Sequence, residues 1–254
     1  SSNTIKGIVK DNLGFLWIAT NSGLCRYDAK GRMKVFQKDI ENNRLQSSNI
    51  QFIYNDSEGF LWIGTRHGGL TKIDVVTDTW TTYRHNPDDE NSLANDEILC
   101  ITEDREGRIW IGTESGLNIF YPKEERFLTF GADETDSTRL QAKAILSLLQ
   151  DKKGRMWIGT WGGGLHLFLP DKDDIKKSTF RNFMIPGENA HKIVWEIYQD
   201  REGRYWMGEE FGLTYMQLPA DASDEKNKQN WNLNFHKYQE KHKLKIRQVY
   251  SIID

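Results

Sequence analysis

Apolar residues recur along this chain at fixed distances before an aspartate. An Ile, Leu or Val stands three and six positions before each of five such aspartates. Strict alternation in a strand would place apolar residues two apart, so a spacing of three predicts a short inner strand with a β-bulge. The five apolar pairs are Ile5 and Ile8, Ile50 and Ile53, Ile98 and Ile101, Ile145 and Leu148, and Val194 and Ile197.

Each aspartate begins the motif D-x-x-G-x, which is followed by a hydrophobic residue, then Trp, then Ile or Met, and then Gly or Ala. Asp is favoured at the first position of a type I turn and Gly at the fourth, so the motif predicts a turn into a second strand. A Gly-Leu pair then marks another turn and a third strand. Alternating segments such as 33–36 and 79–83 predict a fourth, outer strand. The motif aspartates are Asp11, Asp56, Asp104, Asp151 and Asp200.

The motif tryptophans set the period of the repeat. They are Trp17, Trp62, Trp110, Trp157 and Trp206, separated by 45, 48, 47 and 49 residues. A period of about 40–50 residues is typical of four-stranded propeller blades. The chain is therefore predicted to be all-β, a β-propeller of four-stranded antiparallel blades. We place five complete blades at residues 4–46, 47–94, 95–141, 142–190 and 191–244, and the first strand of a sixth at 245–254.

No predicted blade lacks a strand that the opposite terminus would have to supply. We therefore interpret residues 1–254 as one partial β-propeller, a fragment of a larger one. Within it, the motif aspartates are predicted to cap their own turns, and the tryptophans to pack between neighbouring blades. A ring of metal-binding or catalytic aspartates is the alternative, which the glycine fixed three residues after each Asp argues against.

Composition narrows the chemistry. A net charge of −3 lacks the basic character of a nucleic-acid-binding protein, and no apolar run is long enough to insert in a membrane. The six histidines show no zinc-binding spacing, and no nucleophile or phosphate-loop motif occurs. We therefore predict no catalytic residue, no metal site and no cofactor. Cys25 and Cys100 stand at non-equivalent points of the repeat and are expected to be buried thiols.

The segments DSEGFLWIGTRHGGL, DREGRIWIGTESGL and DKKGRMWIGTWGGGL, which begin at Asp56, Asp104 and Asp151, resemble the two-component regulator propeller repeat. The resemblance implies the extracytoplasmic, periplasmic sensor region of a hybrid two-component histidine kinase from a polysaccharide-degrading gut bacterium. It also implies partner domains in the parent chain, a further propeller and an immunoglobulin-like domain, and a homodimeric receptor. The kinase would lie outside this sequence, so the chain itself is not expected to be an enzyme.

Ligand chemistry is expected where the repeats differ, in the loops between the Trp strand and the Gly-Leu pair. Arg66 suits a carboxylate or sulfate, Trp161 can stack on a sugar ring, and Glu210 can accept hydrogen bonds from hydroxyls. Ordinary solvent-exposed loop tips are the alternative for each position. The predicted ligand-binding set, here called the rim residues, is Arg66, His67, Glu114, Trp161, Glu210 and Phe211.

These features predict a sensor propeller that recognises glycan-derived oligosaccharides and relays binding by domain rearrangement to the kinase. A structural or dimerisation scaffold without a ligand site of its own is one alternative. A propeller glycosidase or lyase is another, and it would require convergent acids, for which Glu114, Glu209 and Glu210 are the candidates.

Overall fold

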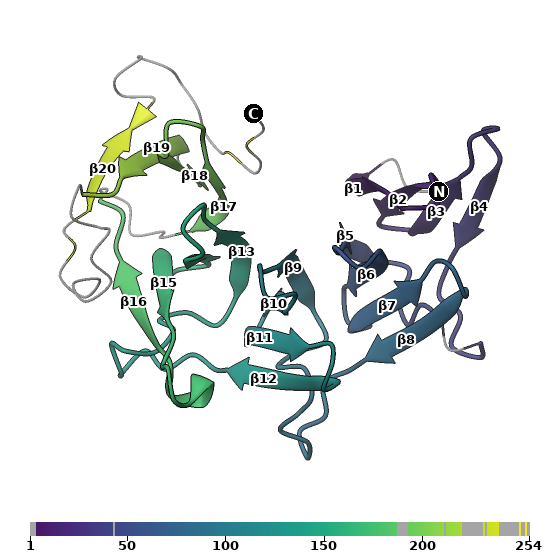
Figure 1. Cartoon of the computed structure of the whole chain (residues 1–254), viewed down its shortest axis with the longest axis horizontal. Coiled ribbons are helices and arrows are strands. Elements are labelled where there is room, and N and C mark those ends of the chain that lie inside the picture. Colours follow the sequence, from purple (N-terminus) through teal and green to yellow (C-terminus); the bar gives the residue numbers. More distant parts are fainter. Residues whose placement is uncertain are drawn as a thin grey trace. The chain divides into compact units, whose positions relative to one another are not determined.

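The computed structural model describes residues 4–42, 44–186, 193–210, 212–219, 231, 233–238, 249 and 252. The chain divides into two compact units, residues 1–131 and 132–254, and each unit is described by itself (Figure 1). The predicted first strand of a sixth blade, 245–254, lies outside the described residues except for Val249 and Ile252.

The first unit contains three sheets. The first consists of β1 (Ile5–Lys10), β2 (Leu16–Thr20), β3 (Gly23–Tyr27) and β4 (Met33–Phe36). The second consists of β5 (Ile50–Asn55), β6 (Phe60–Thr65), β7 (Leu70–Asp74) and β8 (Thr79–Tyr83). The third consists of β9 (Ile98–Glu103), β10 (Ile109–Thr113), β11 (Gly116–Tyr121) and β12 (Arg126–Phe130).

The second unit contains two sheets. The fourth sheet consists of β13 (Ile145–Gln150), β14 (Met156–Thr160), β15 (Leu165–Leu169) and β16 (Thr179–Phe183), with a 3-10 turn η1 (Ile175–Lys177) before its last strand. The fifth consists of β17 (Val194–Gln199), β18 (Tyr205–Glu209), β19 (Gly212–Gln217) and β20 (Asn234–Lys237). All five sheets are antiparallel with strands in chain order, which confirms the predicted all-β, four-stranded units.

The local predictions for the repeat are confirmed as well. The register shifts by one residue within the pairing of each first strand with its second strand, so each of these strands carries the predicted irregularity. In every motif turn the Gly N–H donates to the Asp carbonyl, as Gly107 does to Asp104 at 2.9 Å. Gly107 has φ of 75°, a conformation that a residue with a Cβ adopts only with strain.

Each motif aspartate also binds the tryptophan of its own repeat. One carboxylate oxygen accepts backbone N–H groups of the turn, and the other accepts the indole N–H six residues on. The indole bonds are 2.6 to 2.9 Å long in the five repeats. A polar atom on a large apolar ring needs such a partner when it is buried. This contact therefore allows the tryptophan to enter the core.

The tryptophans pack between neighbouring sheets within each unit. Trp17 shares a buried cluster with Ile50, Ile53 and Leu61 of the second sheet. Trp157 of the fourth sheet likewise clusters with residues of β17 and β18. The predicted packing role is thus confirmed for these indoles, and four of the five are almost fully buried. Trp206 is partly exposed and packs on Tyr215, with ring centroids 5.0 Å apart.

The first strand of the first sheet exposes apolar residues at positions where the second sheet buries them. Ile5 and Ile8 are 57% and 53% exposed, whereas their repeat equivalents Ile50 and Ile53 are 0% and 6% exposed. Cys25 and Cys100 are free and buried, as predicted. Among the described residues, no helix combines the length and the apolar character needed to cross a membrane.

Candidate functional site

The loops that carry the candidate site are held by a buried polar residue on the third strand of the sheet. This residue follows the Gly-Leu pair. In the third sheet it is Asn118, whose Oδ1 accepts the N–H of Ala94 at 2.9 Å. Its amide donates to Thr129 at 2.6 Å, and Thr129 donates to the carbonyl of Ser92 at 3.3 Å. The segment leading into β9 is thereby fixed, and with it the position of Glu97.

His166 has the same role in the fourth sheet. Its Nε2 accepts the backbone N–H of Gln141 at 3.1 Å, which places the proton of the neutral ring on Nδ1. Burial lowers the pKa of His166 to about 4, so the ring stays neutral at physiological pH. The carbonyl of Ala144, a few residues after Gln141, accepts the N–H of Trp161 at 3.0 Å. The buried imidazole thus helps to position the loop that supports Trp161.

Three rim residues of the first unit gather around one carboxylate that the sequence reasoning missed. Glu97 lies 3.2 Å from Nε of Arg66 and 3.6 Å from Nδ1 of His67. Its backbone carbonyl accepts the N–H of Glu114 at 3.1 Å. The structure therefore brings Arg66, His67 and Glu114 together across the second and third sheets, with Glu97 between them.

The charges of this cluster influence one another. The pKa of Glu114 is raised by burial and then by the nearby Glu97 carboxylate, while Arg66 acts in the opposite direction. Glu97 is the most shielded of the three ion-pairing side chains, at 18% exposure, whereas those of Arg66 and His67 remain more than half exposed. The cluster thus presents Arg66 to solvent with two carboxylates beside it, a set that can donate to and accept from sugar hydroxyls.

His67 adopts a strained backbone conformation at the edge of this cluster. Its φ is 64°, in the left-handed region that residues other than glycine rarely occupy. Its carbonyl accepts a hydrogen bond from Arg84 at 3.4 Å, and Arg84 is itself paired with Asp96. The loop is therefore tied to the segment before β9 through Asp96 as well as through Glu97.

Trp161 is the exposed aromatic residue of the second unit that sequence reasoning singled out. It is 53% exposed, unlike the buried motif tryptophans. Its ring meets that of Trp195 at 90°, with centroids 5.3 Å apart. Edge-to-face packing of this kind stabilises an aromatic pair beyond its buried area. Trp161 is thus a supported aromatic surface available for stacking, and Trp195 is a support that the sequence did not reveal.

The acids of the fifth sheet are more buried than their loop position suggested. Glu210 follows β18, and its Oε2 is buried without a hydrogen-bond partner among the described residues. Burial raises the pKa of Glu209, and it raises that of Glu196 to about 7. Phe211, the remaining rim residue, lies outside the described residues. In the described part of the chain, His, Cys, Asp and Glu side chains form no group of three that could hold a metal ion.

The rim residues are thus distributed over both units. Arg66, His67 and Glu114 share one cluster in the first unit, while Trp161 and Glu210 belong to the second. Their assignment to a ligand remains a prediction. Glu97 and Trp195 are additions that only the fold reveals, since both contact rim residues distant in sequence.

Comparison with known proteins supports the reading of the repeat. Residues 44–67, 92–115 and 139–162 match the family model described as two component regulator propeller. Each match runs from an interblade loop through the motif turn to the end of the Trp strand. No curated protein sequence matches the chain.

Solved structures share the fold. The extracellular domain of a proposed hybrid two component system, BT3049 of B. thetaiotaomicron, aligns with a TM-score of 0.72 at 24% identity, over 91% of this chain and 30% of that one. The corresponding domain of BT4673 from the same organism aligns with a TM-score of 0.65 at 19% identity, over 87% of this chain and 29% of that one. This chain therefore spans less than a third of either.

A propeller enzyme has a comparable backbone. Virginiamycin B lyase from Staphylococcus aureus aligns with a TM-score of 0.62 at 14% identity, over 92% of this chain and 69% of that one. At these identities the structural likeness shows the fold, and function must be argued from the site. The chain has the β-propeller fold, and three of its segments match the two component regulator propeller model.

Proposed function

We propose that this chain is part of the sensor region of a hybrid two-component receptor and that it recognises glycan-derived oligosaccharides through the rim residues. The observation that carries the proposal is Trp161, an exposed indole supported edge-on by Trp195. An aromatic face of this kind stacks on the apolar face of a sugar ring. The family match and the BT3049 and BT4673 structures support the receptor assignment.

In this proposal the second and third sheets of the first unit form a polar contact surface of their own. Arg66 donates to a carboxylate, sulfate or hydroxyl, and Glu97 and Glu114 accept hydrogen bonds from hydroxyls. Binding shifts the equilibrium between two arrangements of the receptor, and a kinase outside this chain responds to the shift. The parent protein would place this region in the periplasm, act as a homodimer, and contribute a further propeller and an immunoglobulin-like domain. The chain itself would not be an enzyme.

Calorimetric titration with oligosaccharides released from plant and host glycans tests the proposal. We expect one of them to bind, and Trp161→Ala and Arg66→Ala each to weaken binding about tenfold, a loss of about 1.4 kcal/mol. Val76→Ala is the control, since Val76 is an exposed apolar residue of the β7–β8 turn. Absence of binding together with concentration-dependent dimers would favour a scaffold. Release of a product from any glycan would favour an enzyme.

A further inference from the structure

The motif turn of the fourth repeat carries a positive charge where three other repeats carry a negative charge. At its third position the second, third and fifth repeats carry Glu58, Glu106 and Glu202, whereas the fourth carries Lys153. In the third and fifth repeats this glutamate pairs with the turn arginine, as Glu202 does with Arg204 at 2.9 Å. In the fourth repeat the charge at this position is reversed.

The arginine of the fourth turn is bound differently as a result. Arg155 keeps the contact with its own aspartate, 2.6 Å from Nε to Asp151. Its Nη2 donates to the hydroxyl of Tyr205 at 2.8 Å. In the third and fifth repeats the corresponding Nη2 pairs with the glutamate of the turn. A tyrosine of the next sheet thus replaces the missing acid, and Lys153 has no ion pair within the described part of the chain.

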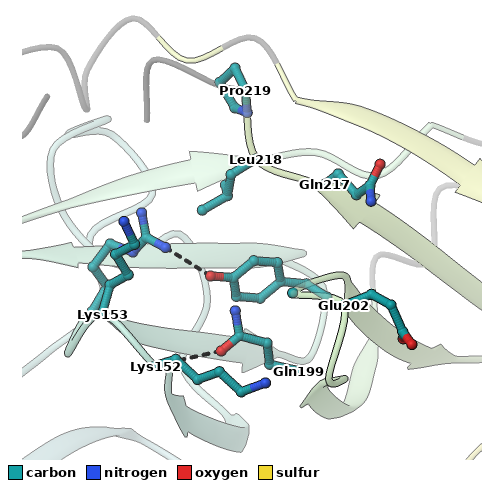
Figure 2. A pocket seen from close by; sticks show the side chains of 10 residues that line it. Lys152, Lys153, Gln199, Glu202, Gln217, Leu218 and Pro219 are labelled. Atoms are coloured by element: carbon teal, nitrogen blue, oxygen red, sulfur yellow. Dashed lines mark hydrogen bonds between the residues drawn. The ribbon is translucent and has the colours of Figure 1, made fainter. Parts of the chain in front are cut away.

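This turn borders a cavity of about 500 Å³ within the second unit. The cavity lies at the end of β14 and β18 opposite to Trp161 and Glu210, because the motif turns precede these strands and the rim loops follow them. Figure 2 shows Lys152 and Lys153 on one side and Leu218 and Pro219 on another. It is lined by Lys152, Lys153, Arg155, Gln199, Glu202, Gly203, Tyr205, Gln217, Leu218 and Pro219.

The lining is basic although the whole chain has a net charge of −3. Lys152 Nζ donates to the backbone carbonyl of Asp200 at 2.9 Å. Gln199 accepts the N–H of Lys152 at 2.9 Å, which fixes its amide at the cavity wall. Glu202, the acidic residue of the lining, is paired with Arg204. Two lysines therefore face a cavity whose acid is already paired.

We propose that this cavity binds an acidic sugar, one that carries a carboxylate or a sulfate. Lys152 and Lys153 would bind the anionic group, and the amides of Gln199 and Gln217 would bind hydroxyls. Leu218 and Pro219 provide an apolar wall for the ring. The volume is in the range of small-ligand sites and large enough for a sugar residue. The site is separate from the rim residues and does not depend on their proposed role.

The test is titration of the chain, followed by NMR or calorimetry, with glucuronate, glucose 6-sulfate and glucose. We expect saturable binding of one or both acids that weakens as salt rises, and no comparable binding of glucose. The preferred acid distinguishes a carboxylate ligand from a sulfate ligand. Lys153→Glu introduces the residue of the second, third and fifth repeats, so the variant is expected to fold, and it should weaken acid binding about tenfold or more.

Two controls accompany this variant. Lys123→Glu makes the same charge change at an exposed position of the first unit and should leave binding unchanged. Trp161→Ala should also leave it unchanged, which separates this site from the rim. Lys153→Gln, a milder change, serves if the glutamate variant is unstable. Equal binding of glucose and the acids, wild-type affinity in both Lys153 variants, or no saturable binding of either acid would overturn the proposal.

Discussion

The hydroxyl of Tyr205, at the start of β18, donates a hydrogen bond of 2.7 Å to Oδ2 of Asp151 in the neighbouring sheet. The same oxygen accepts the indole N–H of Trp157 at 2.9 Å and Nε of Arg155 at 2.6 Å. Burial alone would raise the pKa of Asp151, but these hydrogen bonds outweigh it and hold the pKa below its ordinary value. A tyrosine thus joins two sheets through the carboxylate that anchors the motif tryptophan.

Removal of this hydroxyl should weaken the second unit. Tyr205→Phe leaves the ring in the core but deprives Asp151 of a donor and Arg155 of an acceptor. We expect the free energy of unfolding to fall by about 2 kcal/mol, as for hydrogen bonds to charged groups. Urea denaturation measures it, with Tyr215→Phe as the matched control, because no hydrogen bond to that hydroxyl is found among the described residues. A change below about 0.5 kcal/mol would show that the link is not stabilising.

An aspartate that binds an indole as well as its turn should contribute more to the free energy of unfolding than an aspartate that binds the turn alone. Asp56→Ala leaves the indole N–H of Trp62 and the backbone N–H of Phe60 without acceptors, and we expect a loss of about 3 kcal/mol. Asp56→Asn keeps an amide oxygen as one acceptor and should lose less.

Asp28 provides the comparison for this measurement. It accepts N–H groups of its own turn, from Lys30 and Arg32, and the side-chain Nε–H of Arg32, but no indole of the described residues donates to it. Asp28→Ala should therefore destabilise the chain less than Asp56→Ala in the same urea experiment. Equal losses would mean that the indole contact contributes nothing.

His166 should make stability depend on pH on the acid side of neutrality. Its folded pKa of about 4 lies below the ordinary value of 6.5. Between these values the unfolded chain takes up a proton that the folded chain does not, so the free energy of unfolding falls as pH decreases from 6.5 to 4. The full effect is about 3 kcal/mol.

His166→Asn tests this effect, since Asn118 occupies the same position in the third sheet. The variant should lose stability less steeply than the wild type across this pH range. His236→Asn, at an exposed position of β20, should keep the wild-type slope. Parallel curves for all three proteins would refute the assignment.

The pKa of Glu114 should respond to the charges of its neighbours in the first unit. Glu97→Gln removes the negative charge near Glu114 and should lower the pKa of Glu114, whereas Arg66→Gln removes a nearby positive charge and should raise it. NMR of the side-chain carboxyl carbon of Glu114 during a pH titration measures this pKa in both variants. Glu124→Gln, which removes an exposed acid paired with Arg126, should leave it unchanged. An unchanged pKa in both site variants would mean that the acids are too far apart to interact.

The repeat itself could be predicted because its signals are local. The turn chemistry of Asp104 and Gly107 and the spacing of Ile98 and Ile101 lie within one hairpin, and five copies in register made chance agreement implausible. The aspartate–indole bond was missed, although its sequence signal, a spacing of six residues in all five repeats, was present.

The rest of the candidate site depends on contacts between sheets, which sequence spacing does not encode. Glu97 lies outside the variable loops, and it reaches Arg66 and His67 of the neighbouring sheet while its carbonyl accepts the N–H of Glu114. The role of Asn118 and His166 could have been inferred from a polar residue recurring at one position of an otherwise apolar strand. Their loop partners could not, since the loops differ in sequence.

The bond between aspartate and indole spans six residues, so each repeat brings its own partner for its most demanding buried polar atom. A newly duplicated copy of the gene segment would therefore insert with that requirement already met, and would need from its neighbours little more than apolar surface. Because each repeat satisfies this atom by itself, repeats can be gained or lost in evolution with little other change. The loops remain free to diverge toward new ligands.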